Sequence, residues 1–485
     1  MSVLTDYEPK EVLTFFEDIC SIPHGSENID QISNYLVAFA KKRDLKYRQD
    51  RAGNVIIWKQ GSAGYEDSAP VIIQGHMDMV AVKEEHCQKD LLTEGLDLEI
   101  LDGEWISAKG TSLGGDDGIA VAYALALLDS DTIPHPPLEV VITTNEEIGM
   151  LGADAIDCSD LKGRMLMNID SEDEGIFTVS CAGGVTATSD IPYATEVKNG
   201  TELGIKLTGF KGGHSGAEID KGRLNANVVM GRILNAINTL KSPQIHLISI
   251  NGGEKDNAIA AFSEADILVA DGSAQLVEEA ITAEVTVINE EYKTVEDGIK
   301  VSITKTDKQG VTCFDSHSSD MIPSLLIGLP NGIQRMNPNM EGMVQTSLNL
   351  GIVRTTDKSV TMTSSLRSSS ETEKKYLLSR VRSIVELAGG TVTVSGNYPG
   401  WEYKSDSILR DTMVEAYREQ YGEDPVVEGI HAGLECGIFS SKIPDLDCIS
   451  FGPQMRNIHT TNETLSIPST LRTWELTKNT LKKLK

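Results

Sequence analysis

Three short apolar segments in the first third of the chain alternate with a helical pattern, and this alternation constrains the fold most. Residues 71–75, 138–143 and 165–169 are apolar and partly β-branched, which predicts buried strands. Residues 118–128 are apolar on every side and rich in alanine and leucine, which predicts a buried helix between them. We therefore expect an α/β domain with a central, mostly parallel sheet.

The length of 485 residues exceeds what one compact core usually organises, so two domains are expected. The pattern of the first third returns near Tyr398. Between these parts the chain has β-rich and helical segments but fewer histidine and acid clusters. We predict a discontinuous catalytic domain of residues 1–184 and 398–485, with an α+β lid domain, residues 185–397, inserted into it.

Charge and cysteine content exclude several classes of protein. The formal net charge of −29 opposes binding to nucleic acid or anionic lipid. The seven cysteines are odd in number and form no C-x-x-C pair, which argues against a disulfide framework or a thiolate zinc site. No basic, apolar leader opens the sequence, and no apolar stretch approaches the ~20 residues that span a bilayer. These features predict a cytoplasmic protein.

Polar side chains follow the predicted strands at the points where they end. His76 and Asp78 follow the first strand, and Asp170 ends the third. Ligands of open α/β sheets bind beyond the carboxyl ends of the strands, so these side chains should share one site. A neutral imidazole is a good metal ligand, and a neighbouring carboxylate can orient its ring. Each motif alone, including His459 near the end of the chain, is more often structural than functional.

Two pairs of adjacent acids strengthen the prediction of a metal site. Asp116 and Asp117 stand among glycines ahead of the apolar helix, where capping would account for only one of them. Glu146 and Glu147 follow a buried strand, where two carboxylates repel each other unless a cation or a proton lies between them. We expect one aspartate to bind metal, one glutamate to bind metal, and the other glutamate to act on a water molecule.

The combined motifs offer histidine and carboxylate ligands without a thiolate. This donor set suits zinc or another first-row divalent ion. The number of acids favours two ions that share a bridging aspartate.

The order of these motifs resembles that of the cocatalytic zinc peptidases, a clan that includes aminoacylases and carnosinases. The finer resemblance is to the bacterial aminoacyl-histidine dipeptidases, and it extends over nearly the whole chain. It is carried by five further motifs: Asp102-Gly-Glu-Trp-Ile, Cys181-Ala-Gly-Gly, Lys211-Gly-Gly-His-Ser-Gly, Tyr398-Pro-Gly-Trp and His431-Ala-Gly-Leu-Glu-Cys-Gly.

The resemblance implies two zinc ions, which manganese or cobalt could replace, and five ligands for them: His76, Asp116, Glu147, Asp170 and His459. Asp116 would bridge the ions, His76 and Asp170 would complete one site, and Glu147 and His459 the other. The catalytic residues implied are Asp78, which would orient His76, and Glu146, which would be the general base.

The same resemblance implies four substrate-binding residues: His214, Asn257, Arg367 and His431. His214 would stabilise the tetrahedral intermediate, while Asn257 and Arg367 would hold the carboxyl end of the substrate. The implied activity is hydrolysis of unblocked dipeptides, including Xaa-His. For assembly it leaves two alternatives, a homodimer formed through the lid or a single chain whose enlarged lid delivers His214 itself.

The sequence departs from its relatives at three places. Asp117 is usually asparagine in them, the loop after His459 usually reads Ser-Pro, and residues 271–319 match no familiar motif. Three alternatives share the metal core: an N-acyl-amino-acid deacylase, a tripeptide aminopeptidase, and an inactive peptide-binding relative. The retained Glu146 and complete ligand set argue against the last. A di-metal phosphoesterase is disfavoured because no basic cluster accompanies the acids.

Overall fold

The structure of the protein, a computed structural model, describes residues 3–240 and 243–485. The chain divides into two compact units. Unit 1 contains the chain up to Cys181 together with Trp401–Gly429 and Leu434–Lys485, and unit 2 contains Ala182–Gly400 and Ile430–Gly433. No helix in the described part of the chain is long and apolar enough to cross a membrane.

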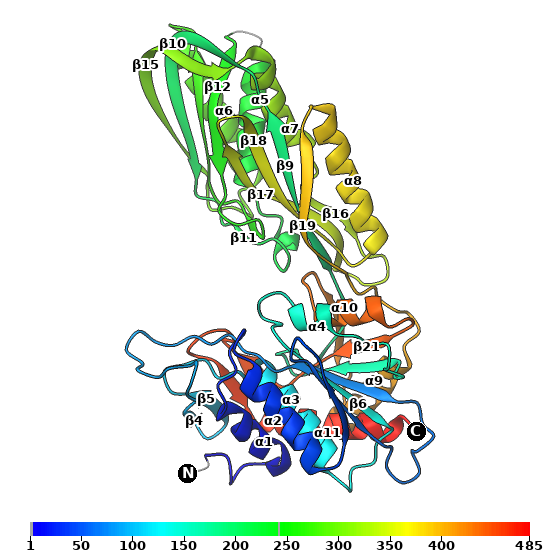
Figure 1. Ribbon diagram of the computed structural model, residues 1–485. Helices are drawn as coiled ribbons and strands as arrows, with labels where there is room; N and C mark the ends of the chain where they lie inside the picture. The colour runs from blue at the N-terminus through cyan, green and yellow to red at the C-terminus, as the bar shows by residue number, and fades with distance from the viewer. Residues whose placement is uncertain (1–2, 241–242) are drawn as a thin grey trace. The chain divides into compact units, whose positions relative to one another are not determined.

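Unit 1 is built on an eight-stranded sheet with the order β1-β2-β6-β3-β7-β21-β8-β20 (Figure 1). The central strands β6, β3, β7 and β21 are parallel, and the neighbouring strands β2 and β8 pair with them antiparallel. The strands are β1 (Lys46–Gln49), β2 (Val55–Lys59), β3 (Val71–His76), β6 (Leu138–Thr143), β7 (Met165–Asn168), β8 (Ile176–Cys181), β20 (Val426–Ile430) and β21 (Asp447–Ser450). The predicted α/β class with a mostly parallel central sheet is confirmed.

The helices of unit 1 include the one predicted from residues 118–128. This helix, α3 (Gly115–Asp129), is buried from Gly115 to Leu128, and it packs against α1 and β3. Alanine lets a helix approach its neighbours closely, which suits a helix enclosed on all sides. The other helices are α1 (Lys10–Cys20), α2 (Asp30–Lys42), α4 (Leu151–Ala155), α9 (Ile408–Tyr421), α10 (Glu435–Lys442) and α11 (Ile467–Lys483).

A small second sheet in unit 1 joins distant parts of the chain. Its strand order is β22-β23-β5-β4. The strands are β4 (Leu98–Leu101), β5 (Trp105–Ala108), β22 (Met455–Arg456) and β23 (Thr464–Ser466). Leu465 of β23 pairs with Ile106 of β5. The loop between β22 and β23, which carries His459, is thereby held beside the segment that leads into α3.

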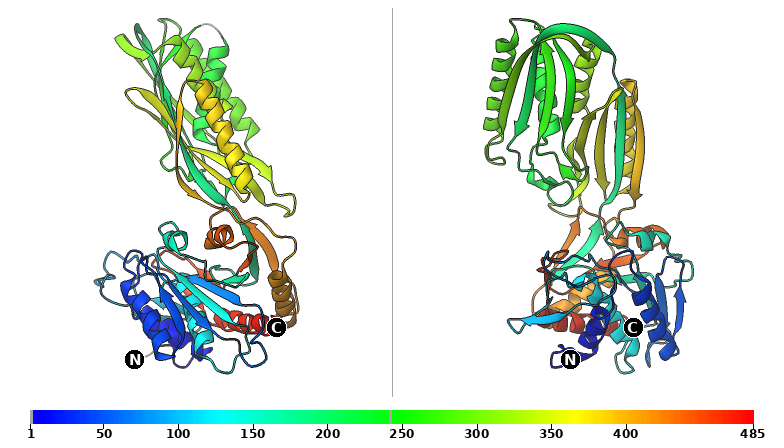
Figure 2. Two further views of the ribbon diagram at one scale, coloured as in Figure 1. Left: turned by 45° about the vertical axis from the view of Figure 1, so that its right-hand side comes forward. Right: turned by 60° about the vertical axis from the view of Figure 1, so that its left-hand side comes forward.

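Unit 2 is an α+β unit around a nine-stranded antiparallel sheet, with the order β15-β10-β14-β12-β17-β18-β9-β19 and β16 beside β17. Figure 2 shows its helices gathered on one side of this sheet. The strands are β9 (Gly183–Pro192), β10 (Thr195–Thr208), β12 (Ile245–Gly252), β14 (Ser263–Val269), β15 (Lys300–Phe314), β16 (Gly332–Met336), β17 (Val344–Thr355), β18 (Ser359–Ser368) and β19 (Thr391–Tyr398). A separate pair is β11 (Gly213–His214) with β13 (Ala258–Ile259).

The helices of unit 2 bury one face each against the sheet. In α8 the buried residues Lys374, Leu377, Val381 and Val385 recur every three or four positions, which places them on one side of the helix. The helices are α5 (Ala226–Thr239), α6 (Ala274–Glu291), α7 (Ser316–Gly328) and α8 (Glu371–Leu387), with a short 3₁₀ turn at Ile219–Lys221. The stretch 271–319, which matched no motif, forms α6, β15 and the start of α7.

Candidate metal centre

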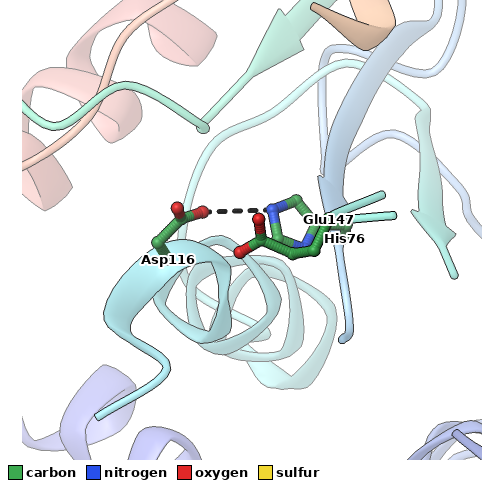
Figure 3. Close-up of side chains that lie close together, drawn as sticks. All are labelled: His76, Asp116 and Glu147. Atoms are coloured by element: carbon green, nitrogen blue, oxygen red, sulfur yellow. Dashed lines mark hydrogen bonds and ion pairs between the residues drawn. The ribbon is translucent and has the colours of Figure 1, made fainter. Parts of the chain in front are cut away.

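Side chains from five segments of unit 1 meet beyond the ends of the central strands. His76 ends β3 and is level with Thr143 of β6, so the turn that follows β6 brings Glu147 beside it. Asp170 lies two residues beyond β7, the strand on the other side of β3. Asp116 comes from the start of α3 and His459 from the loop between β22 and β23. Figure 3 shows His76, Asp116 and Glu147 facing one another.

Asp116 lies between the two histidines. Its Oδ1 is 3.1 Å from Nε2 of His76, and its Oδ2 is 3.0 Å from Nε2 of His459. Oε2 of Glu147 is 3.0 Å from the same nitrogen of His459, and Oδ1 of Asp170 is 3.4 Å from Nε2 of His76. The two oxygens of Asp116 therefore face different histidines. A carboxylate in this arrangement can bridge two metal ions.

Two overlapping groups of residues have ligand atoms close enough to hold a metal ion. The ligand atoms of His76, Asp116 and Glu147 lie within 4.8 Å of one another, and so do those of His76, Asp117 and Asp170. These groups contain four of the five predicted ligands and add Asp117. The fifth, His459, lies 3.0 Å from both Asp116 and Glu147.

Asp116 and Asp117 have different surroundings, although they are neighbours in the chain. The peptide bond between them is cis, and neither residue has helical backbone angles. The N-cap of α3 is Gly114, which has no capping side chain, so neither aspartate caps this helix. Asp117 is fully buried, and its Oδ2 accepts a hydrogen bond of 3.1 Å from the backbone N–H of His76. Asp117 therefore supports the backbone of β3 at the point where Asp116 faces the histidines.

The ring of His76 is oriented through the residue two positions further on. Its Nδ1 lies 2.9 Å from the backbone carbonyl of Asp78 and 3.7 Å from the Oδ1 of that residue. A carbonyl acceptor favours a proton on Nδ1, which leaves the lone pair of Nε2 free for a metal ion. The Asp78 carboxylate accepts hydrogen bonds from the Glu146 backbone at 3.0 Å and from Ser26 Oγ at 2.8 Å. Asp78 thus ties β3 to the Glu146–Glu147 turn.

The electrostatics of the cluster favour a cation. Burial raises the pKa of Glu146 to about 9 and also raises the pKa of Glu147. Hydrogen bonds to Asp116 and Glu147 raise the pKa of His459 to about 10. The buried oxygens Oδ1 of Asp117 and Oε1 of Glu147 accept no hydrogen bond. Imidazole nitrogens and carboxylate oxygens with unused lone pairs fit divalent ions, which would replace the proton that His459 otherwise carries.

A buried glutamate holds the loop that carries Asp116. Glu463 is 2% exposed, and its carboxylate accepts hydrogen bonds from four consecutive backbone N–H groups, those of residues 113–116. The four distances range from 2.8 Å at Gly115 to 3.4 Å at Asp116. Since Glu463 follows His459 by four residues, one side chain links both loops. This contact could not be predicted from the sequence, because the segment after His459 has no pattern that points to residues 113–116.

A second buried carboxylate lies in a polar network beside the metal centre. Glu435 is fully buried, and its Oε2 accepts hydrogen bonds from Thr143 Oγ1 at 2.7 Å and from Gln74 Nε2. Gln74 in turn accepts a hydrogen bond of 2.7 Å from Asn168 Nδ2. This network joins β6, β3 and β7. The sequence indicates this polar network through Gln74, because a polar residue inside an apolar strand needs buried hydrogen-bond partners.

Three of the four predicted substrate-binding residues meet in unit 2. A Cβ atom at Gly216 would lie 2.9 Å from His214 Cε1, 3.2 Å from Arg367 Nε and 2.5 Å from the His431 carbonyl. The side chain of Asn257 is exposed, and its backbone carbonyl accepts a hydrogen bond from Ser215. The sequence predicted these residues from the resemblance, and the structure groups them around Gly216.

The group around Gly216 has a positive centre. Arg367 is 8% exposed, it donates to Tyr398 Oη at 3.1 Å, and its Nε has no hydrogen-bond partner. Burial and the charge of Arg367 lower the pKa of His214, and they lower the pKa of His431 to about 4. Both histidines are therefore neutral near pH 7, which leaves Arg367 as the charged group. A guanidinium with a free donor suits a carboxylate.

The fold and the centre together define a metal-dependent hydrolase. His76, Glu147 and Asp170 follow parallel strands, and Asp116 and His459 join them from two other segments. This set of imidazole and carboxylate donors suits metal-activated water. The chain belongs to the peptidase family M20/M25/M40, whose family model matches residues 72–483. The family predicted from the motifs is confirmed.

Two relatives match over nearly their full length. The chain is 35% identical over 486 residues to the cytosol non-specific dipeptidase of Escherichia coli (strain K12), covering 100% of this chain and 99% of the relative. The crystal structure of aminoacylhistidine dipeptidase from Vibrio alginolyticus matches with a TM-score of 0.95 and 34% identity, covering 99% of this chain and 98% of that one.

A more distant structure shows the same fold. An aminopeptidase from Bacillus cereus matches with a TM-score of 0.56 and 14% identity, covering 99% of each chain.

Proposed function

We propose that the protein is a cytoplasmic dipeptidase that hydrolyses unblocked dipeptides, including Xaa-His, with the help of two zinc ions. The observation that carries the proposal is Asp116, whose two oxygens face His76 and His459 at 3.1 and 3.0 Å. The names of the two similar proteins support a dipeptide substrate, and one of them is called cytosolic. Histidine and carboxylate ligands are compatible with zinc, manganese and cobalt.

Asp116 would bridge the two ions. His76 and Asp170 would complete the ligands of one ion, and Glu147 and His459 those of the other. When bound, the two ions would lower the pKa of a water molecule and polarise the scissile carbonyl. Asp78 positions His76 through the backbone carbonyl 2.9 Å from Nδ1.

Glu146 accepts the proton of the attacking water and then delivers it to the departing amine. Burial raises the pKa of its carboxyl, and two divalent ions beside it would lower that pKa again, so that the ionised carboxylate can take the proton near neutral pH. The carboxylate of Glu147, 3.0 Å from His459, is occupied as a ligand and cannot do the same work.

Unit 2 supplies the groups for the rest of the substrate. His214 donates to the oxyanion as it forms. Arg367 pairs with the C-terminal carboxylate of the substrate, with Asn257 and His431 beside it. We propose that residues 185–397 serve as the lid of the enzyme. A homodimer formed through the lid and a monomer remain the two alternatives for assembly, and sedimentation analysis distinguishes them.

A substrate panel tests the proposed function. The protein is stripped of metal, reloaded with zinc, manganese or cobalt, and assayed against dipeptides, tripeptides and N-acetylated amino acids. We expect turnover of unblocked dipeptides only, and none without metal. A preference for N-acetyl substrates would identify a deacylase, and a preference for tripeptides an aminopeptidase. Full activity in a verified metal-free preparation would overturn the proposed mechanism.

A further inference from the structure

A loop of unit 2, residues 211–224, carries His214, and a buried carboxylate from another segment of this unit closes it. Glu296 is 5% exposed. Its Oε2 accepts a hydrogen bond of 3.0 Å from the backbone N–H of Lys211, and its Oε1 accepts one of 2.9 Å from the backbone N–H of Leu224. Because these residues are the two ends of the loop, a single side chain fixes both ends.

Glu296 belongs to the stretch 271–319, which matches no familiar motif. It lies in the turn between α6 and β15, and its backbone N–H donates to the carbonyl of Tyr292 at 2.9 Å. Asn289, in the last turn of α6, fixes the same turn. Its side chain donates to the carbonyl of Ile299 at 3.0 Å and accepts from the N–H of that residue at 2.7 Å. The position of Glu296 is therefore set by its own segment and not by the loop that it holds.

The loop engages one ring nitrogen of His214. Its Nδ1 accepts hydrogen bonds from the backbone N–H of Ala217 at 3.0 Å and of Gly216 at 3.3 Å. Burial and the charge of Arg367 lower the pKa of His214, so the ring is neutral near pH 7. In a neutral imidazole the nitrogen that accepts carries no proton, which places the proton on Nε2. The loop therefore leaves His214 with a single ring donor, the N–H of Nε2.

A second carboxylate stabilises the loop from within. Oε2 of Glu218 accepts a hydrogen bond of 2.9 Å from the backbone N–H of His214, and Oε1 lies 2.9 Å from Nη2 of Arg223. Arg223 in turn donates to the carbonyl of Gly212 at 2.7 Å. These contacts hold His214 in place within the loop, whereas Glu296 holds the loop in place relative to α6 and β15.

A donor for an oxyanion acts only from a fixed position. It must lie about 2.7–3.1 Å from the point at which the negative charge develops. A displacement of ~1 Å, even one caused far from the reacting bond, can cost ~100-fold in rate. The N–H of His214 Nε2 therefore depends on the ends of its loop, and Glu296 accepts hydrogen bonds from both of them.

We propose that Glu296 is a positioning residue for catalysis: it anchors the loop of residues 211–224, so that His214 presents the N–H of Nε2 to the oxyanion. The inference rests on the proposed function, in which His214 stabilises that oxyanion. It also gives the stretch 271–319 a role, because the turn that carries Glu296 lies within it. Glu296 acts through His214 and not on the substrate itself.

The test is a double-mutant cycle on the zinc-loaded enzyme with Ala-His as substrate. Glu296→Gln replaces one acceptor oxygen with an NH₂ group, so one end of the loop is released. We expect kcat to fall ~10- to 100-fold, because the donor is displaced. KM should change by less than about threefold, because the oxyanion exists only in the transition state. The metal content should not change, since every candidate ligand lies in unit 1.

His214→Ala completes the cycle. This variant removes the donor and should lower kcat ~100- to 1,000-fold. The double variant should be no slower than His214→Ala, within about threefold, because residues that act through one group do not lose activity additively. Glu296→Asp is a second substitution that keeps the charge and both acceptor oxygens. Its side chain is one methylene shorter, so it should displace the loop by up to ~1 Å and lower kcat in the same direction.

Asp297→Asn is the matched control. Asp297 is the next residue in the chain, its side chain is 83% exposed, and it pairs with the ammonium group of Lys211 at 3.1 Å. An exposed ion pair contributes little, so kcat and KM should stay within about twofold of the wild-type values.

NMR of protein labelled with ¹⁵N histidine gives a readout that does not depend on turnover, because protonated and unprotonated ring nitrogens have different chemical shifts. The His214→Ala variant identifies the signals of His214. The wild type should carry the proton on Nε2, and Glu296→Gln should show a mixture of the two tautomers, since the loop no longer holds Nδ1 against its backbone donors.

The possible results separate this inference from the function on which it rests. Full kcat in a folded Glu296 variant, a rise in KM alone, additive losses in the double variant, or a wild-type proton on Nδ1 would overturn the inference while the dipeptidase function stands. Full kcat in His214→Ala contradicts the proposed role of His214 and the inference with it. A wild type that cleaves no dipeptide contradicts the proposed function as well.

Discussion

Glu146 and Glu147 are adjacent in the chain but have different contacts. Oε2 of Glu147 lies 3.0 Å from His459, whereas the backbone N–H of Glu146 is fixed by Asp78. We expect Glu146→Gln to lower kcat by ~100- to 10,000-fold while both metal ions stay bound, because an amide cannot accept the proton.

Its partner variant, Glu147→Gln, should lower the metal content instead. Metal analysis and kinetics on both proteins decide the assignment. Loss of metal from Glu146→Gln, or full metal with lost turnover in Glu147→Gln, would show that the two roles are reversed.

Glu463 shows how a residue outside the ligand set can control the metal centre. In Glu463→Gln an NH₂ group replaces one of the two oxygens that accept from the backbone of residues 113–116. Some of the buried N–H groups of residues 113–116 would then face the NH₂ group, which is itself a donor. The lost hydrogen bonds should lower the free energy of unfolding by ~1–3 kcal/mol. The loop that carries Asp116 should loosen, and metal affinity should fall ~10- to 100-fold, as is usual when the partners of metal ligands are removed.

The matched control for Glu463 is Glu475→Gln. The Glu475 side chain is 46% exposed and pairs with Lys478 at 2.8 Å, so its loss should change stability by less than about 0.5 kcal/mol. Chelator competition measures metal affinity, and denaturant unfolding measures stability. Unchanged metal affinity in Glu463→Gln would show that the carboxylate only stabilises the fold.

For single residues, the sequence indicates which side chains belong to the metal site better than it indicates which residues they contact. The paired acids could be recognised because adjacent buried carboxylates need a cation or a proton between them. Which aspartate faces the histidines was predicted only from the resemblance, because it depends on the backbone at Asp116 and Asp117, where the angles are not helical. Glu463 and Leu113 are 350 residues apart in the sequence, so no local pattern specifies the contact between Glu463 and residues 113–116.

At the scale of elements, the site follows from parallel strands with apolar sequences. Because β3, β6 and β7 are parallel neighbours, residues that follow them must meet at one edge of the sheet. The convergence of His76, Glu147 and Asp170 could therefore be predicted from three strand ends. The position of His459 was predicted only from the resemblance, because it depends on the pairing of β23 with β5, whose short strands have little pattern of their own.

Helix α5 offers a prediction about stability in unit 2. Its N-cap Asn225 accepts hydrogen bonds from the backbone of Asn227 and Val228, and it donates to the carbonyl of Leu350 in β17 at 2.9 Å. Asn225→Ala should lower stability by at least ~1 kcal/mol, because it removes both the cap and this link between elements.

Ser370→Ala is the control for the cap of α5. Ser370 is the N-cap of α8 but makes no capping hydrogen bond, so its replacement should have a much smaller effect. Thermal unfolding of the two variants measures the difference. Equal losses would show that the capping bonds of Asn225 add nothing.

At the scale of the whole molecule, every candidate ligand lies in unit 1 and the group around Gly216 lies in unit 2. Each unit has a sheet and helices of its own, so each should unfold as a cooperative body. We therefore expect the free energy of unfolding to divide between the two units.

Metal removal tests this division. An ion that binds only the folded state stabilises it by RT ln(1 + [L]/Kd), which is ~4 kcal/mol at a thousandfold excess over Kd. Since all candidate ligands belong to unit 1, a chelator should lower the melting temperature of one calorimetric transition and leave the other in place. Asn225→Ala should shift the second transition and spare the first, which assigns each transition to its unit. A single transition that moves under both treatments would show that the two units unfold together, and that the metal centre stabilises the whole chain.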